Sequence, residues 1–444
     1  MLYHLTKSIV RMGIRGFFNK IVILGKEHLE QPVPTIAIVN HPSALIDPLV
    51  VATATSRRLH FIAAAEYFGK GLQKKILSEE YNMVPVYRPH MYEGEEFSND
   101  DMFVACFETL ARNGCIVVFP EGNSVTEKHI RSLKTGVARI MYGFQKLHPD
   151  KKINILPIGL NYSDAHRFQS NVIMNIGQPQ HIHMDVSKSE EPDQEEVLKA
   201  TEKMYEMLKD EVIHHDKSEL SELVGSVDKI WGIKIYNALK KGKEKALLAF
   251  RKEQKIVSKI ENLEAAEIDQ LRLKTDSFLQ KLQKHRVKPQ AFTETDNISF
   301  LWLVGMVLGL PVYLYGFLSN IIPYLVSRYL FKNKFLPKIT DYGVKNGLTP
   351  AFVGTLAYSV GVVTYLIWYL ILGLILSLTT LWWVGIVFYL TGYYAGIFSL
   401  KYAGKVLQFY RRYQLAFKIK KAKDLSHIKE EYKALISMLR DFAR

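Results

Sequence analysis

The sequence predicts an α/β fold, a mixed sheet flanked by helices, followed by a helical middle segment and C-terminal transmembrane helices. Short apolar runs alternate with helix-like stretches between Ile21 and Ile176, as strands and helices do in an α/β domain. The next stretch, Pro192 to Pro289, is rich in Glu, Lys and Leu and has no internal proline, which favours helices. Residues 351–400 contain no charged side chain, a length that holds two membrane spans of about 20 residues each.

These patterns divide the chain into six regions. We expect an amphipathic interfacial helix at 1–20, an α/β domain at 21–190, a helical segment at 191–290, a membrane hairpin or re-entrant segment at 297–331, a transmembrane helix hairpin at 351–400 and a basic cytoplasmic tail at 401–444. The first region places apolar residues among Lys7, Arg11 and Arg15. Such a helix either lies in a membrane interface or packs on the core of the domain.

The elements of the α/β domain follow in order. Apolar and β-branched runs predict strands at 21–24, 36–39, 59–63, 83–87, 115–119, 153–161 and 172–176. Helical spacing of apolar residues predicts helices at 47–55, 66–78, 102–113 and 137–147. In the helical segment, helices are expected at 194–214, 224–255 and 264–285.

Composition narrows the class of partner. The formal net charge of +14 suits nucleic acid or an anionic membrane surface, and the long apolar stretches favour the membrane over nucleic acid. The two cysteines, Cys106 and Cys115, lie in apolar contexts without metal-ligand spacing. Neither a disulfide framework nor a metal site is therefore expected, and a reducing cytoplasmic face is favoured.

A histidine and an aspartate follow the apolar run Ile36 to Val39. His41 stands at the end of that strand, and Asp47 comes six residues later. An aspartate that accepts one ring N–H of a histidine fixes the tautomer and leaves the other nitrogen free to take a hydroxyl proton. The pair is a candidate general base with its orienting carboxylate. The alternative is that His41 caps a turn and Asp47 begins a helix.

Other strand ends carry polar groups that suit an anionic ligand. Arg88 follows the strand 83–87 and can bind phosphate through two hydrogen bonds, although most arginines at strand ends are solvated. Gly122, after strand 115–119, allows a ligand to approach the backbone, and Glu121 can accept hydrogen bonds from ligand hydroxyls. Lys134 lies in a positive patch just before a helix N-terminus, where anion binding is favoured over a solvated face.

Four stretches of the sequence, in their order along the chain, resemble the four sequence blocks of the glycerolphosphate (PlsC-type) acyltransferases of phospholipid synthesis. His41 and Asp47 match the family's first block, Arg88 ends its second, Phe119 to Ser124 match its third, and the strand 155–160 with its proline matches the fourth. Five residues separate His41 from Asp47, where the commonest family pattern has four. This variant resembles a subgroup that acts on glycerol 3-phosphate or dihydroxyacetone phosphate.

The resemblance implies a membrane-bound O-acyltransferase with His41 and Asp47 as catalytic residues. The expected substrate-binding residues are Arg88, Glu121, Gly122, Ser124 and Lys134. No cofactor and no metal is expected. No acyl-enzyme is needed, because the donor, acyl-CoA or acyl-carrier protein, is already an activated thioester. Glycerol 3-phosphate, 1-acylglycerol 3-phosphate and dihydroxyacetone phosphate all remain open as acceptors, as does the oligomeric state.

Other functions remain open beside acyl transfer from a thioester. One is a catalytically inactive lipid-binding membrane scaffold, for which the extra residue between His41 and Asp47 is the best support. Another is a lipid transacylase. A transporter is disfavoured, because the spans are few and the apolar stretches hold no charge.

Basic residues flank the apolar stretches, with Lys332 and Lys334 between them and Lys401 and Lys405 after them. The positive-inside rule places all these flanks, and with them the catalytic domain, on the cytoplasmic face. Residues 297–331 must then leave and return on one side, as two short helices or a re-entrant hairpin broken near Pro311. A single span, which would put the Lys332 loop outside, is the rival. The tail at 401–444 has 12 basic and 4 acidic residues, as expected for a helix on anionic lipid headgroups.

Overall fold

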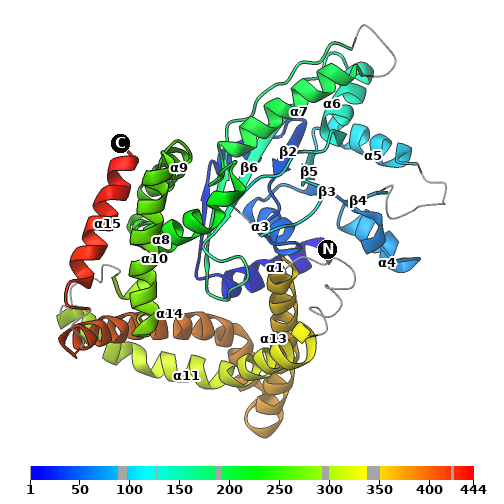
Figure 1. Cartoon of the computed structure of the whole chain (residues 1–444). Coiled ribbons are helices and arrows are strands. Elements are labelled where there is room, and N and C mark those ends of the chain that lie inside the picture. Colours follow the sequence, from blue (N-terminus) through cyan, green and yellow to red (C-terminus); the bar gives the residue numbers. More distant parts are fainter. Residues whose placement is uncertain are drawn as a thin grey trace. The chain divides into compact units, whose positions relative to one another are not determined.

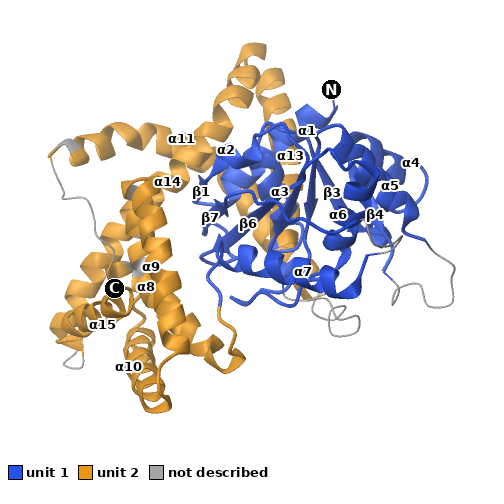
Figure 2. Ribbon diagram, turned by 90° about the horizontal axis from the view of Figure 1, so that it is seen from above, with its two compact units in different colours: residues 1–214, 349–354 blue, residues 215–348, 355–444 orange. Residues whose placement is uncertain are grey.

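The computed structural model describes residues 2–88, 98–126, 128–186, 192–292, 300–337, 351–421 and 425–444. The chain divides into two compact units, residues 1–214 with 349–354 and residues 215–348 with 355–444 (Figure 2). Within the predicted regions, residues 1, 89–97, 127, 187–191, 297–299 and 422–424 lie outside the described residues.

The first unit is built on a seven-stranded sheet (Figure 1), so the predicted mixed sheet is confirmed. The strand order is β1-β7-β6-β2-β5-β3-β4, and neighbouring strands are parallel except for β6 and β7. The strands are β1 Lys20–Leu24, β2 Thr35–Val39, β3 Leu59–Ala64, β4 Met83–Val86, β5 Cys115–Val118, β6 Asn154–Tyr162 and β7 Asn171–Ile176.

The central strand β2 determines where the site lies. All five of its residues are buried, because helices cover both faces of a sheet of this kind. β2 runs parallel to β5 on one side and to β6 on the other. Their carboxyl ends therefore meet at one edge, and the residues that follow these strands are brought together there.

Helices flank the sheet on both faces. α5, α6 and α7 pack on one face through a cluster that includes Ile38, Cys106, Leu110, Ile116 and Met204. α1 and α3 pack on each other and lie on the side of the sheet away from α7 (Figure 2). The helices are α1 Leu2–Phe17, α2 Lys26–Leu29, α3 Ile46–Ala54, α4 Leu72–Lys75, α5 Asp100–Ala111, α6 Gly136–Leu147 and α7 Gln194–Lys209.

α1 combines features of both interpretations of the first region. Ile14 and Phe17 are buried, so the second half of the helix packs on the domain. Leu2 and Leu5, in the first half, are exposed. The apolar residues in the second half of α1 therefore pack on the core of the domain, whereas those in the first half are exposed on the surface.

Two predictions for this unit are wrong. The helix expected at 66–78 is divided into a 3-10 turn Ala65–Tyr67, α4 and a π-helical turn Ile76–Glu80, because Gly69 and Gly71 take positive φ angles of 63° and 61° that interrupt a helix. The domain boundary expected after residue 190 is also misplaced. α7 packs on β6, and the first unit extends to His214.

The second unit contains α8, α9, α10 and α15. The single helix expected at 224–255 is instead two, because Gly242 has a φ of 120° and separates α8 from α9. α15 packs on α9 and α10 and buries Leu435, Ile436 and Leu439. The apolar face of α15 is therefore covered by protein. The bounds are 3-10 Ser218–Leu220, α8 Ser221–Lys241, α9 Lys243–Glu261, α10 Ala265–Lys284, 3-10 Pro289–Phe292 and α15 Ile428–Phe442.

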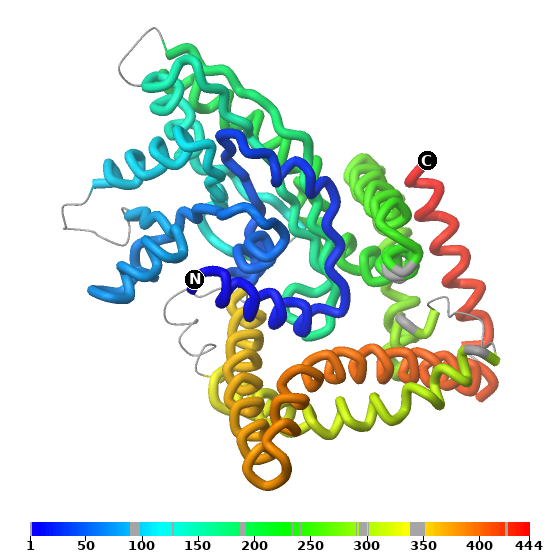
Figure 3. Tube along the Cα trace, turned by 180° about the vertical axis from the view of Figure 1, so that it is seen from behind, coloured from blue at the N-terminus to red at the C-terminus, as the bar shows by residue number. Residues whose placement is uncertain are grey.

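Three helices of the described chain are long and apolar enough to cross a membrane, which is the pattern of a membrane-associated protein. They are α11 Phe300–Leu330, extended by a π-helical turn Phe331–Phe335, α13 Phe352–Thr379 and α14 Trp382–Lys421. α13 and α14 meet at Thr380 and Leu381, so the hairpin expected within 351–400 is present. α11 and α14 run side by side (Figures 1 and 3).

The hairpin or re-entrant segment expected at 297–331 is wrong. α11 is one helix that continues through Pro311 and Pro323. A proline removes one backbone hydrogen bond, and neighbouring helices can satisfy the carbonyl groups that this affects. Here Tyr402 Oη donates to the carbonyl of Met306 at 2.9 Å, in the turn before Pro311.

Candidate active site

The centre of the site is a histidine–aspartate pair at the carboxyl end of β2. His41 Nδ1 lies 2.8 Å from Asp47 Oδ2, with the Asp47 side chain fully buried and that of His41 19% exposed. Because a carboxylate can only accept, Nδ1 holds the ring proton and Nε2 keeps a free lone pair. The Phe119 ring stacks on the imidazole with the ring centroids 4.2 Å apart. The pair has the geometry of a general base.

Asp47 is held by two further donors. The Ser43 N–H donates to Oδ2 at 2.7 Å, and Tyr162 Oη donates to Oδ1 at 2.7 Å. Burial, and then the adjacent Asp47 charge and the hydrogen bond to it, raise the pKa of Tyr162 well above its ordinary value, so its hydroxyl remains a donor. Three hydrogen bonds stabilise this buried carboxylate and fix its orientation toward His41.

The five-residue turn between His41 and Asp47 is compatible with their contact. Ala44 takes a φ of 42°, and this left-handed conformation accommodates the additional residue in the turn. Ser124 holds the turn, since its Oγ accepts from the Ala44 N–H at 2.8 Å and donates to the His41 carbonyl at 2.8 Å. Ser124, which was expected to bind substrate, therefore stabilises the backbone of the turn between His41 and Asp47.

Glu121 has a similar role. Its Oε1 accepts from the His41 backbone N–H at 3.0 Å, and its Oε2 accepts from the Arg131 N–H at 3.2 Å. Arg131 also pairs with it through Nε at 3.5 Å. Only 8% of Glu121 is exposed, and each of its carboxylate oxygens accepts a hydrogen bond from the protein.

Gly122 and Lys134 lie together, as the sequence predicts. Gly122 has a φ of 78°, and a Cβ placed on it would lie 3.5 Å from Lys134 Cγ. The Lys134 N–H donates to the Pro120 carbonyl at 2.8 Å, which fixes this lysine beside the glycine turn. Its side chain is exposed, and Nζ has no ion-pair partner within the described part of the chain. This lysine is available to an anion.

Arg88 reaches the same turn but already has a partner. Its guanidinium pairs with Glu66, Nε to Oε1 being 3.0 Å, and its Nη1 lies 3.4 Å from Asn123 Oδ1. A phosphate bound by Arg88 would compete with the Glu66 carboxylate.

The structure links His41, Asp47, Glu121 and Ser124 directly by hydrogen bonds. Two residues of this network, Tyr162 and Arg131, were not among the residues singled out from the sequence. Tyr162 ends β6, the neighbour of β2. Its place just after the fourth block, the strand 155–160, is the feature of the sequence from which its role could have been predicted. Arg131 belongs to the positive patch, but its bonds to Glu121 and to the Asn123 carbonyl follow from the tertiary fold.

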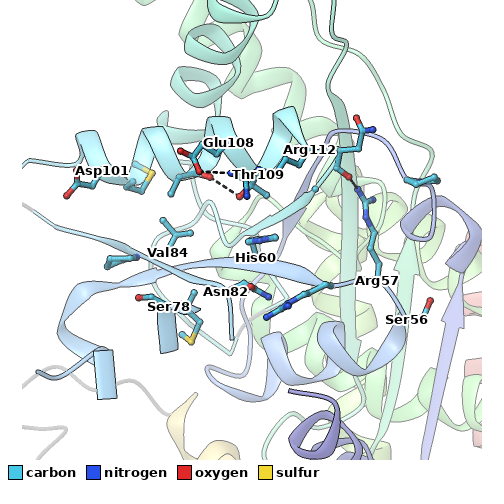
Figure 4. Close-up of a pocket in the computed structure, with 18 of the residues that line it drawn as sticks. Ser56, Arg57, His60, Ser78, Asn82, Val84, Asp101, Glu108, Thr109 and Arg112 are labelled. Atoms are coloured by element: carbon cyan, nitrogen blue, oxygen red, sulfur yellow. Dashed lines mark hydrogen bonds and ion pairs between the residues drawn. The ribbon is translucent and has the colours of Figure 1, made fainter. Parts of the chain in front are cut away.

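A cavity of about 720 Å³ lies elsewhere in the first unit (Figure 4). It lies between α5 and the chain at the start of β3 and β4, with His60 and Asn82 in its interior and Arg112 just after the end of α5. These residues adjoin the amino ends of the strands, whereas His41 follows a carboxyl end. No predicted site residue lines this cavity, so it is distinct from the site of the histidine–aspartate pair.

The histidines and cysteines show no metal site in the described residues. His214 and His215 are 8% and 2% exposed. His214 Nδ1 accepts from the Ile130 N–H at 2.9 Å. This hydrogen bond holds the backbone of the loop that contains Arg131 and Lys134. Cys106 and Cys115 are free and buried, and burial raises the pKa of each thiol to about 12.

Comparison with known proteins identifies the family of this segment. The acyltransferase family model matches residues 20–161. Glycerol-3-phosphate O-acyltransferases 1 and 2 of Saccharomyces cerevisiae are 40% identical over 88 residues and 32% identical over 85 residues, or 20% and 19% of this chain. An uncharacterised acyltransferase of Schizosaccharomyces pombe is 30% identical over 117 residues, or 26% of this chain. The matches span 12%, 11% and 16% of those relatives' own lengths.

A solved structure is also similar. The 1-acyl-sn-glycerophosphate (LPA) acyltransferase PlsC from Thermotoga maritima covers 47% of this chain and 78% of its own, with 19% identity and a TM-score of 0.33. The family match contains every site residue predicted from the sequence. Residues 20–161 of this chain therefore match the acyltransferase family.

Proposed function

We propose that the chain is a membrane-bound O-acyltransferase of phospholipid synthesis. It moves a fatty acyl group from acyl-CoA or acyl-carrier protein to glycerol 3-phosphate or 1-acylglycerol 3-phosphate. The observation that carries the proposal is the 2.8 Å contact between His41 Nδ1 and Asp47 Oδ2, which leaves Nε2 free for an acceptor hydroxyl. The family match and the yeast relatives support the same reaction class.

The chemistry follows from the free Nε2. His41 takes the hydroxyl proton as the acceptor oxygen attacks the thioester carbonyl carbon. Asp47 stabilises the imidazolium that results. The tetrahedral intermediate then collapses, the carbon–sulfur bond breaks, and the leaving thiolate takes the proton from His41. The products are the ester and the free thiol, and no acyl-enzyme is required.

The acceptor phosphate is proposed to bind beside Gly122. Lys134 offers an exposed ammonium group at that turn, and Arg88 offers a planar guanidinium if the phosphate displaces Glu66. The basic flanks of the apolar helices support a catalytic domain on the cytoplasmic face.

The test is thiol release from palmitoyl-CoA by detergent-purified protein. Glycerol 3-phosphate, 1-acylglycerol 3-phosphate and dihydroxyacetone phosphate are offered separately, and palmitoyl-acyl-carrier protein replaces the CoA ester in a second series. Release that depends on one acceptor should fall by about 10²- to 10⁴-fold in His41→Ala, the range for loss of a general base. His427→Ala, at a side chain 80% exposed, is the matched control and should keep wild-type rates.

Two results would overturn the proposal. One is the absence of acceptor-dependent release with either donor, which would favour the lipid-binding scaffold. The other is equal activity of His41→Ala and His427→Ala. Acyl transfer from a phospholipid donor, without a thioester, would instead identify a transacylase.

A further inference from the structure

The chain just before α11 and the chain just after α14 lie together in the second unit. α15 packs on α10, where Lys281 Nζ lies 2.7 Å from Glu431 Oε1 and the rings of Phe278 and Tyr432 stack. Near the end of α14, Lys418 Nζ donates to the His285 carbonyl at 2.8 Å. Segments that pack and exchange ion pairs in this way occupy one aqueous compartment. Both ends of the apolar region are therefore on the same side of a membrane.

The start of α13 is on that side as well. Ala351 is fully buried, and Gly354 lies so close to Ala165 and Ser43 that an added Cβ would be 2.7 Å from the Ala165 carbonyl oxygen. These four residues belong to the first unit. The described chain from that unit to α10 contains no helix that could span a membrane, so α10 is on the same side of the membrane as the start of α13.

The number of crossings between Phe292 and Ala351 must therefore be even. α11 is the single candidate span in the described part of that interval. The sequence 338–350 contains Lys338, Asp341 and Lys345 and is shorter than the roughly 20 apolar residues that a helical span needs. One uninterrupted helix cannot cross twice. We infer that α11 does not cross the membrane but lies within one leaflet, against α14.

The dimensions of α11 fit this arrangement. Its 31 residues extend about 46 Å, well beyond a hydrocarbon core of about 30 Å. One side packs closely on α14, where Gly316 adjoins the Ala395 carbonyl. Much of the remainder is apolar and exposed along the whole length, including Phe300 at 79%, Val307 at 70% and Leu318 at 66%. This surface fits the acyl chains of lipids, and all main-chain groups can be satisfied within the helix.

The same reasoning assigns α13 and α14 a different path. Between Gly354 and Lys418 the described chain has two candidate spans, an even number. The chain therefore enters the membrane in α13, turns at Leu381 and returns in the first part of α14, where Gly385 adjoins Ser377 and Tyr389 adjoins Gly373. This part precedes the stretch of α14 that packs on α11. Trp382 and Trp383 are exposed at that turn, as aromatic side chains at a membrane interface are. The result is a hairpin with a leaflet helix beside it, rather than three spans.

The test uses single cysteines and a membrane-impermeant maleimide on sealed vesicles from the expression host. The variants are Asn333→Cys, just after α11, Leu381→Cys at the hairpin turn and Lys255→Cys on α9, all at exposed positions. Wild-type protein is the blank, because its two buried thiols have a pKa of about 12 and do not form the reactive thiolate. Each variant is first required to elute as the wild type does in size-exclusion chromatography.

We expect Asn333→Cys and Lys255→Cys to label to the same extent in intact vesicles, whichever way the vesicles face. Leu381→Cys should show the opposite sidedness or react only after detergent is added. Labelling of Asn333→Cys with the sidedness opposite to Lys255→Cys would overturn the inference and restore α11 as a span. Labelling of Leu381→Cys like Lys255→Cys would overturn the insertion of the hairpin. Neither readout depends on acyl-transfer activity, so this test is independent of the proposed function.

Discussion

Asp47 is the residue on which the geometry of the site depends most. It is fully buried and accepts hydrogen bonds from His41 Nδ1, the Ser43 N–H and Tyr162 Oη. Two of these donors belong to the turn that also contains Asp47, and the third comes from β6. Tyr162 therefore holds the carboxylate from outside its own turn, as a positioning residue for His41.

Replacing Tyr162 with Phe tests this role. The variant keeps the ring and loses the donor to Asp47 Oδ1, and a hydrogen bond to a charged group contributes about 1.5–3 kcal/mol. We expect kcat to fall about tenfold, with KM for the acyl donor unchanged and a shifted pH–rate profile. Tyr413→Phe, at a side chain 64% exposed, is the control. A rise in KM alone would contradict the positioning role.

At the residue scale, the sequence identified the groups that do the chemistry but not those that hold them. His41 and Asp47 stand in one short motif, so the sequence identified them as a candidate pair, although the five residues between them left their contact open. Ser124 and Glu121 were assigned to substrate because a motif shows residue type without showing what each side chain touches. Their partners, Ala44 and Arg131 among them, come from other loops, and that pairing is a property of the tertiary fold.

At the scale of elements, Glu30 links α2 to the end of α3. Its Oε2 accepts from Ser56 Oγ at 2.7 Å, its Oε1 accepts from the Ser56 N–H at 3.1 Å, and Lys26 lies 3.3 Å away. Burial opposes ionisation of this carboxyl, but the Ser56 hydrogen bonds and the Lys26 contact outweigh it and lower the pKa to about 2. Because the folded pKa lies below the ordinary value of 4.5, the stabilisation is complete above pH 4.5 and is lost as the pH falls toward 2.

Glu30→Gln should therefore melt at a lower temperature than wild type at pH 7, with a loss of about 1 kcal/mol in the free energy of unfolding. The difference should narrow as the pH falls below 4.5, which melting curves of detergent-purified protein between pH 7 and pH 3.5 would measure. Glu27→Gln, an exposed position in the same helix, is the control and should show no such pH dependence. A difference that stays constant with pH would contradict the assignment.

Most elements could be predicted, because each strand of the sheet is an apolar run and each helix has its own spacing. The wrong predictions occur where a single residue overrides the helical spacing of its neighbours. Gly242 separates α8 from α9 although the flanking residues favour helix, and Gly69 and Gly71 divide the helix expected at 66–78. Pro311 has the opposite effect from the one expected, because α14 packs alongside and the helix continues.

At the scale of the whole molecule, the start of α13 belongs to the catalytic unit. Gly354 contacts Ala165 and Ser43, and the Ser43 N–H holds Asp47. No pattern in the sequence predicts that contact, because Gly354 lies 189 positions from Ala165 and 311 positions from Ser43. The assignment of α7 to the first unit was missed for the same reason. Composition alone does not show which unit a helix packs on.

Gly354→Ala tests whether α13 influences the site. An added Cβ would lie 2.7 Å from the Ala165 carbonyl oxygen, so that carbonyl or the start of α13 must shift. Ser43 Oγ donates to the same carbonyl at 3.2 Å, so the shift can reach the catalytic turn, where a displacement of about 1 Å can lower the rate by about 10²-fold. Gly361→Ala, on the same helix with nothing within 4 Å of its added Cβ, is the matched control. We expect kcat to fall in the first variant only, at an unchanged melting temperature. Equal kcat values would show that α13 does not act on the catalytic turn.

The outermost strand β4 also affects how the molecule behaves in solution. A strand at the edge of a sheet offers its free main-chain groups to any extended chain that approaches, and this is a common beginning of aggregation. β4 has four residues, and one of them, Pro85, has no N–H. A strand from another molecule would therefore find few free main-chain groups on β4 with which to form hydrogen bonds. At this edge, neighbouring copies of the protein are discouraged from joining their sheets into one.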